Sequence, residues 1–373
     1  MMNISVVTKQ NGWRRGPCDF YPLIKWNKNL KREGININFI SDHKQKIESD
    51  IVILDHRYYE MIIKNNRGKK KRGPKNKDFI KNFLNNLAAN GKKTILFENG
   101  DGAGSRHFDM IEHVDLFVKK QVLKNTKEYT VDNGFSNKMV FVGHYGLTEK
   151  QIEKNKATNI DPCPKDQIHK IKCGWNIGMQ NYMELPAKKI FPNRAKAVLD
   201  KTLGGPNFTS VELKRDIDAS YRGALKDFSE NYSWQRKKVI EFLQSDSVFN
   251  FITGKGLPKK KYLEELRKSK ICISPFGWGE VCYRDFEAII NGAILVKPHM
   301  NHINTYPNIY LEGETYISLD WDLKNIENVM RDLLNNYDDY KRIAINASEL
   351  YKDNLLSYNN FSTTFKKLIK YVC

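Results

Sequence analysis

Short apolar runs alternate with longer segments of helical period along most of the chain, and this alternation constrains the fold more than any other feature. Such alternation is typical of α/β units built around parallel strands. In the first half we expect strands at 3–7, 36–40, 51–54, 94–97, 116–118 and 139–142. In the second half we expect them at 219–222, 249–253, 271–274, 293–297 and 315–318.

Segments with apolar residues at helical spacing separate many of these strands. We expect helices at 19–32, 78–89, 234–244, 258–269, 280–291 and 323–335. An irregular stretch with several prolines, 157–208, divides the two series of units. Because 373 residues exceed the roughly 100 to 200 residues of one ordinary domain, the sequence predicts two successive α/β domains.

The chain is strongly basic, with 62 Lys and Arg against 43 Asp and Glu and a formal charge of +19. Such a surface attracts anionic partners, and nucleic acid, an acidic membrane surface or a nucleotide diphosphate would each satisfy it. No apolar run approaches the roughly 18 residues of a membrane span. Six scattered cysteines without metal-ligand spacing, and no secretory signal pattern, lead us to expect a cytoplasmic protein without bound metal.

The densest group of cations is Lys64–Lys77, which reads KNNRGKKKRGPKNK. It lies between an expected strand and an expected helix, which predicts a basic surface loop. A solvated loop, peripheral contact with an anionic membrane, and contact with nucleic acid all remain open for this segment.

The most informative stretch is 271–298, which reads as strand, glycine-containing loop, helix, glycine stop and strand. Helical spacing places Glu280, Arg284 and Glu287 within an arc of about 60° on one face. The loop before this helix, which includes Gly279, ends where free N–H groups favour an anion. An arginine one turn in could clamp a phosphate, and a carboxylate further along could accept ribose hydroxyls. An exposed face with an Arg284 to Glu287 ion pair is the alternative.

This segment resembles the donor-binding motif of GT-B glycosyltransferases, in particular the exostosin-like and the lipopolysaccharide or capsule branches. The matching elements are Gly279 and Glu280, then Arg284-Asp-Phe-Glu287, then the strand that ends at Pro298. The resemblance implies that Glu287 holds the ribose and Arg284 meets the diphosphate. Glu280 and Glu287 are separated by six residues rather than the seven common in retaining members, so the role of Glu280 and the stereochemistry stay open.

The resemblance also implies a GT-B-like α/β fold, in which two Rossmann-type domains face each other across a cleft. The acceptor-side domain is then expected at 1–175 and the linker at 176–210. The domain that binds the nucleotide sugar is expected at 211–350, and a C-terminal helix at 351–373 would cross back to the first domain.

Other loops of the second half fit a nucleotide-sugar donor. Arg222 and Gly223 end one expected strand, and Lys255 lies between two glycines after the next. Either cation could neutralise a leaving diphosphate. The Asp-x-Asp triplets at 216–218 and 320–322 do not stand where a metal-dependent donor site would need them, so we expect no cofactor and no metal requirement.

The first half would bind the acceptor. A glycine-rich loop carries Trp13, Arg14 and Arg15, which suit stacking on a sugar and binding an anion. Asp19 follows this loop and is a further acceptor-binding candidate, which would become the candidate base if the loop with Glu98 and Asp101 does not supply one. His144, in a Gly-His-Tyr-Gly stretch, is interpreted as an acceptor-side ligand or a turn residue.

Two acids, Glu98 and Asp101, lie in a glycine-rich loop after an expected strand and could supply a general base. The chain also resembles phage DNA β-glucosyltransferases in size, charge and its Arg-x-x-Glu helix. In those enzymes the base occupies a comparable strand–loop position, for which Asp101 is the nearer match and Glu98 the reserve. A solvated Asp-Gly turn is the alternative.

These features together predict a metal-independent glycosyltransferase that moves a sugar from a nucleotide diphosphate to a hydroxyl of a glycan or glycolipid. The alternative is a DNA-modifying glycosyltransferase, or a non-enzymatic nucleic-acid-binding protein that uses the basic surface. The sequence leaves the sugar, the nucleotide and the acceptor undetermined.

Overall fold

The structure, a computed structural model, describes residues 1–9, 18–65, 78–131, 162–184, 192–223 and 230–373. Several sequence predictions lie outside these ranges. They are the expected strand at 139–142, most of the basic loop 64–77, and the acceptor-side candidates Trp13, Arg14, Arg15 and His144.

The first domain is built on a parallel sheet with the strand order β2-β1-β3-β4-β5-β7. The strands are β1 (Met2–Val7), β2 (Ile35–Ile40), β3 (Ile51–Asp55), β4 (Lys93–Glu98), β5 (Leu116–Lys119) and β7 (Ile171–Cys173). Its helices include α1 (Tyr21–Lys25), α2 (Asn27–Arg32), α3 (His56–Asn65) and α4 (Asp78–Ala89). The helix expected at 19–32 is therefore two helices, because the backbone leaves helical geometry at Trp26.

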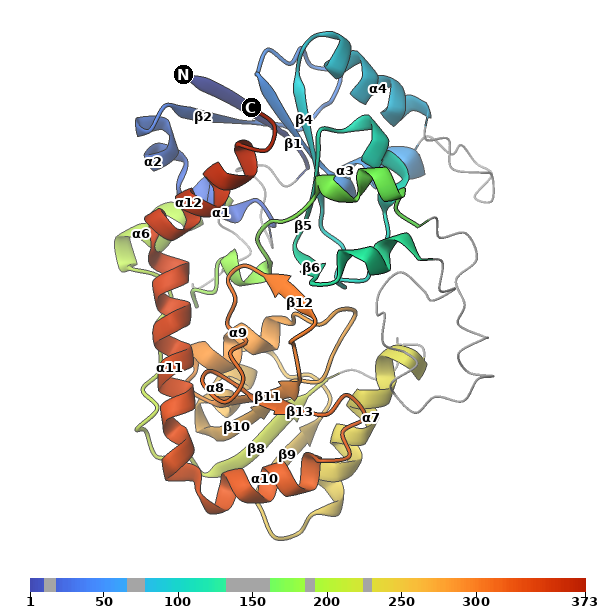
Figure 1. The fold of residues 1–373 in the computed structure, drawn as a ribbon. Coiled ribbons are helices and arrows are strands. Elements are labelled where there is room, and N and C mark those ends of the chain that lie inside the picture. Colours follow the sequence, from blue (N-terminus) through green and yellow to red (C-terminus); the bar gives the residue numbers. More distant parts are fainter. Residues whose placement is uncertain (10–17, 66–77, 132–161, 185–191, 224–229) are drawn as a thin grey trace.

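The second domain has a parallel sheet with the order β13-β11-β10-β8-β9. Its strands are β8 (Ile217–Arg222), β9 (Phe251–Gly254), β10 (Ser269–Ile273), β11 (Ile294–Pro298) and β13 (Ile317–Leu319). The helices around it are α7 (Glu230–Ser245), α8 (Lys259–Lys268), α9 (Tyr283–Ile290) and α10 (Ile326–Asn335). The predicted α/β fold with two Rossmann-type domains is confirmed (Figure 1).

Elements from both domains also join directly. Strand β6 (Gln121–Leu123) of the first domain pairs antiparallel with β12 (Ile303–Thr305) of the second. Short 3-10 helices occur nearby at η1 (Phe108–His113), η2 (Thr126–Thr130), η4 (Lys165–Lys170) and η5 (Ile177–Met179). These contacts bring the carboxyl ends of the two sheets toward each other.

The C-terminal helices return the chain to the first domain. Helix α11 (Tyr337–Leu356) runs along the second domain, and α12 (Tyr358–Ile369) follows it (Figure 1). Phe361 and Phe365 of α12 pack on Trp175 with ring centroids 5.6 and 6.1 Å away. The segment expected as a linker contains helix α6 (Asn193–Leu203), whose Asp200 accepts a hydrogen bond from Tyr21 of the first domain.

Helix α9 begins later than the sequence pattern predicts. Its capping residue is Cys282, whose backbone N–H donates to the Asp285 carboxylate at 3.0 Å, so the helical turn cannot extend back to Glu280. Glu280 therefore lies in the preceding loop, and the expected polar stripe keeps only Arg284 and Glu287. Within the described ranges, no helix has both the length and the apolar character that crossing a membrane requires.

Candidate active site

A cavity of about 500 Å³ lies between the two domains, at the carboxyl ends of their strands. Loops after parallel strands form ligand sites at this edge of a sheet, and a volume of this size is ordinary for a small-molecule site. Charged side chains come from both sides: Asp19, Arg57, Asp101 and Lys120 from the first domain, and Arg222, Arg236, Arg284 and Glu287 from the second.

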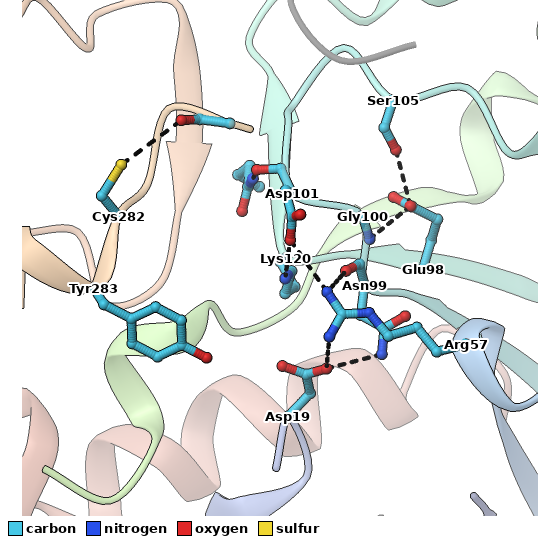
Figure 2. A network of polar contacts seen from close by, with 12 residues as sticks. Asp19, Arg57, Glu98, Asn99, Gly100, Asp101, Ser105, Lys120, Cys282 and Tyr283 are labelled. Atoms are coloured by element: carbon cyan, nitrogen blue, oxygen red, sulfur yellow. Dashed lines mark hydrogen bonds and ion pairs between the residues drawn. The ribbon is translucent and has the colours of Figure 1, made fainter. Parts of the chain in front are cut away.

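Arg57 organises the wall that the first domain contributes (Figure 2). One guanidinium nitrogen lies 3.4 Å from the Asp19 carboxylate. The other donates to the backbone oxygen of Asn99 at 3.0 Å and to Asp101 at 3.1 Å. Arg57 lies in the first turn of α3, directly after β3, and its contacts join this helix to Asp19 and to the loop that follows β4.

Asp101 is the accessible carboxylate of this wall. Its side chain is 45% exposed and also lies 3.6 Å from Lys120. The Asp19 side chain, in contrast, is only 4% exposed and accepts hydrogen bonds from Asn99 and Gln180 at 2.9 and 3.1 Å. Both residues line the cavity, but Asp101 has the freedom to meet a substrate hydroxyl.

Glu98, the reserve candidate for the base, lies behind the loop and does not line the cavity. It accepts hydrogen bonds from Lys119 at 2.6 Å, from the Gly100 N–H at 2.7 Å and from Ser105 at 2.8 Å. Burial opposes its charge, but Lys119 and the nearby histidines outweigh this and lower the pKa of Glu98 to about 2. Such a buried, paired carboxylate is unsuited to take a proton from a substrate, and it holds the loop of Asp101 instead.

The second domain contributes a wall that is rich in arginine. Arg284 lies on α9, its guanidinium 4.7 Å from the centre of the Tyr221 ring. It donates to the backbone oxygen of Arg222 at 2.8 Å, and its Nε is buried without a hydrogen-bond partner among the described residues. Arg236 of α7 reaches the same wall, where burial lowers the pKa of its guanidinium. One buried and one half-buried guanidinium group on the same wall favour an anion.

Glu287 lines the cavity one turn beyond Arg284, as its spacing on the helix requires. Its side chain is 13% exposed and forms an ion pair with Lys259. Lys259 is itself well exposed, so this pair can open to a ligand. The arrangement brings Arg284 and Glu287 together in the way that the sequence motif predicts.

Three other candidates for donor binding are placed differently from the expectation. Arg222 lines the cavity, but its guanidinium is bound to the Glu265 carboxylate by hydrogen bonds of 2.6 to 3.1 Å, so its charge is already neutralised. Lys255 is exposed and does not line the cavity, although its neighbours Gly256 and Leu257 do. Gly223 also lies outside the lining, and its N–H donates to the Gly254 oxygen at 3.2 Å.

The Gly279-Glu280 pair connects the two domains. A Cβ atom on Gly279 would lie 1.6 Å from the backbone oxygen of Asp101, so only glycine permits this approach. The buried Glu280 carboxylate accepts a hydrogen bond from the Ala103 N–H at 2.8 Å. Gly279 therefore lines the cavity through its contact with the opposite loop, whereas Glu280 lies outside the lining.

A buried ion pair positions α9 and its two functional side chains. Lys297 lies 2.6 Å from Asp285, and both side chains are fully buried. Asp285 also accepts hydrogen bonds from Ser274 at 2.5 Å and from Tyr310 at 2.7 Å. Because every charge here has a partner, the network fixes the start of α9 against β10 and β11.

Sequence reasoning missed several residues of the site, of which Arg57, Lys120 and Arg236 carry charge. Arg57 and Lys120 each follow directly after a strand of the first sheet, so the rule that ligands bind at carboxyl ends could have identified them. Arg236 belongs to the helix expected at 234–244, but only the tertiary structure shows that this cation is buried at the cavity.

No protein-family profile and no curated protein sequence matches this chain. Solved structures of similar fold include an α-glucosyltransferase in complex with UDP, at 12% identity over 99% of this chain and 100% of that one, with a TM-score of 0.46. A DNA-modifying β-glucosyltransferase shows 11% identity over 99% and 100%, with a TM-score of 0.45. An α1,3-fucosyltransferase shows 12% identity over 99% and 90%, with a TM-score of 0.44. All three of these solved proteins are glycosyltransferases.

Proposed function

We propose that the protein is a glycosyltransferase that moves a sugar from a nucleoside diphosphate to a hydroxyl of a glycan or glycolipid, without a metal ion. One observation supports this proposal above the others. The interdomain cavity has the buried Arg236 and the half-buried Arg284 on one wall, and the carboxylate of Asp101, which is 45% exposed, on the opposite wall.

The arginine wall suits the diphosphate of a donor. Arg284 is half-buried, its buried Nε lacks a partner among the described residues, and the buried Arg236 lies on the same wall. A phosphate oxygen would supply the missing acceptor and offset the cost of holding two cations together away from water. Glu287, one turn along α9, could accept the ribose hydroxyls once Lys259 moves aside.

The opposite wall suits an acceptor hydroxyl. Asp101 would take the proton of this hydroxyl as the new bond forms, while Arg284 and Arg236 stabilise the charge that develops on the leaving diphosphate. The cavity lies between two domains that contact each other at Gly279 and Glu280, and the bound substrates would displace water from the reacting sugar. If the reaction retains configuration, Asp101 loses the role of base.

The cavity constrains the identity of the acceptor less than that of the nucleotide-sugar donor. We infer a glycan or glycolipid in the cytoplasm, with peripheral contact to an anionic membrane through Lys64–Lys77. The net charge of +19 also favours the alternative, in which DNA is the acceptor or the binding partner. Steep loss of duplex-DNA binding with added salt, together with sugar transfer to DNA, would support that alternative.

Calorimetric titration with uridine, UMP and UDP tests the donor site. We expect affinity to rise with each phosphate, by about tenfold or more from UMP to UDP, because the arginines bind the phosphates. GDP, CMP and dTDP then identify the base. Equal affinity for uridine and UDP would show that the arginine wall does not bind a diphosphate, and would overturn the proposal.

A transfer assay tests the chemistry. The nucleotide sugar that matches the best nucleotide is incubated with oligosaccharide, glycolipid or duplex DNA, and release of the nucleotide is measured with and without Mg²⁺. We expect transfer to the oligosaccharide or glycolipid that does not depend on Mg²⁺. Transfer to DNA alone would move the assignment to the alternative acceptor.

A further inference from the structure

Three potential metal ligands converge behind the loop 98–107. His56 follows β3, Glu98 ends β4, and His107 lies at the end of the loop. One ligand atom from each of the three lies within 4.8 Å of the other two. None of these residues lines the interdomain cavity, so the cluster is separate from the proposed donor and acceptor sites.

His56 supplies an independent sign that something is bound here. Its side chain is 3% exposed, and its Nε2 has no hydrogen-bond partner among the described residues. The ring packs against His107 with centroids 4.3 Å apart and against Tyr59 at 4.9 Å. A buried imidazole nitrogen without a partner is costly, and a metal ion would satisfy it.

Glu98 presents one carboxylate oxygen to this cluster. Its Oε2 is held by Lys119 at 2.6 Å, whereas its Oε1 lies 3.9 Å from His107 Nε2. Oε1 also accepts hydrogen bonds from the Gly100 N–H and the Ser105 hydroxyl. The ammonium of Lys119 opposes a cation nearby, so the two imidazoles must contribute much of the affinity.

We propose that His56, Glu98 and His107 bind a divalent transition-metal ion of the Zn²⁺ class. Two imidazoles and one carboxylate form a common zinc donor set that leaves a fourth position for water. Imidazole ligands do not suit Mg²⁺ or Ca²⁺, which prefer oxygen. Tetrahedral zinc ligands stand roughly 3.3 Å apart, whereas the ligand atoms of the cluster lie within 4.8 Å of one another, so the cluster must contract by up to about 1.5 Å on binding. His107 is 27% exposed and gives the ion a route from solvent.

Metal binding would join the end of β3 to both ends of the loop that carries Asp101. The ion would thus stabilise the position of this loop without contacting substrate. The inference rests on the three ligands alone and does not depend on the proposed glycosyltransferase activity.

Titration of the full-length, metal-free protein with Co²⁺, followed by visible absorption, tests this site. The variants are His56→Ala and His107→Ala, and His113→Ala is the matched control, since His113 lies outside the cluster in the adjacent 3-10 helix. We expect one Co²⁺ per chain in the wild type and in His113→Ala, displaced by Zn²⁺. Each of the two ligand variants should weaken binding by more than about tenfold.

Because His56 is buried, its variant could lose the fold, which circular dichroism would reveal. In that case, the variant His107→Ala alone tests the proposal, because His107 is partly exposed. No stoichiometric Co²⁺ binding in the wild type, or equal affinity in His107→Ala and the wild type, would overturn the proposal. An increase in the unfolding temperature with Zn²⁺ that His107→Ala abolishes and His113→Ala retains would support it.

Discussion

The two walls of the interdomain cavity differ at one residue, Arg284, in how far their charges are paired with opposite charges. On the first-domain wall the charges pair with one another, since Arg57 contacts Asp19 and Asp101, and Lys120 lies near Asp101 (Figure 2). On the second-domain wall, Arg284 donates only to uncharged oxygens among the described residues.

Under the proposed function, this difference suits the two walls to different ligands. A wall whose charges are already compensated gains little from a charged ligand, but it can exchange hydrogen bonds with neutral hydroxyls. A half-buried guanidinium that has no carboxylate partner gains more from an anion than a guanidinium that is already paired. Under the proposed function, this contrast favours a hydroxyl substrate at the first domain and a diphosphate at the second.

The largest effect is expected on the first wall. Asp101→Asn keeps the shape of the loop but removes the proton acceptor, so kcat should fall by about 10² to 10⁴ while nucleotide affinity stays nearly constant. Steady-state kinetics and calorimetry on the same preparation measure both. Full turnover in Asp101→Asn would exclude Asp101 as the base, and Asp19→Asn would then test the remaining carboxylate of this wall.

Arg284→Ala should affect binding and chemistry together. The loss of a charged hydrogen-bond donor to the diphosphate should cost about 2 kcal/mol, which raises the nucleotide Kd about 30-fold and also lowers kcat. Arg331→Ala is the control, because Arg331 is partly exposed on α10 and pairs with Glu327. An unchanged nucleotide Kd in Arg284→Ala would show that Arg284 does not bind the diphosphate, and the proposed difference between the two walls would be wrong.

Glu287→Ala should weaken nucleotide affinity about tenfold, because the ribose hydroxyls lose their acceptor. Its partner offers a matched test, since Lys259→Ala frees the carboxylate and should leave affinity unchanged or higher. Calorimetry with UDP and with its deoxyribose counterpart tests whether Glu287 contacts a ribose hydroxyl. If Glu287→Ala binds both equally well and as tightly as the wild type, Glu287 has no role at the ribose.

The smallest effect on binding is expected from Arg222→Lys. Glu265 already neutralises Arg222, so the nucleotide Kd should change by less than about threefold. The free energy of unfolding should fall by about 1 kcal/mol, because lysine cannot reproduce the forked hydrogen bonds. Denaturant titration and calorimetry separate the two effects. A large loss of nucleotide affinity at normal stability would restore Arg222 to the donor site.

Sequence periodicity was sufficient to predict the two α/β domains, because the spacing of apolar residues in each strand and helix reflects which of its faces is buried. The motif around Arg284 and Glu287 was also recognisable, since residues three apart on a helix share a face whatever surrounds it. Glu280 was misplaced onto that face because the helix start depends on the side chain of Asp285, whose buried partners Lys297 and Tyr310 come from later in the chain.

The sequence by itself determined the fold class, the basic charge, and the pairing of an arginine with a glutamate on one helix. Only the tertiary structure decided which charges remain available to a ligand. Glu98 and Asp101 look equivalent in one loop, yet Lys119 from the next strand buries and neutralises the first, while the second stays 45% exposed. Arg222 and Arg284 likewise look alike in the sequence, but among the described residues Glu265 forms an ion pair with Arg222 and not with Arg284. Charge compensation depends on contacts between distant segments, and a linear pattern does not record such contacts.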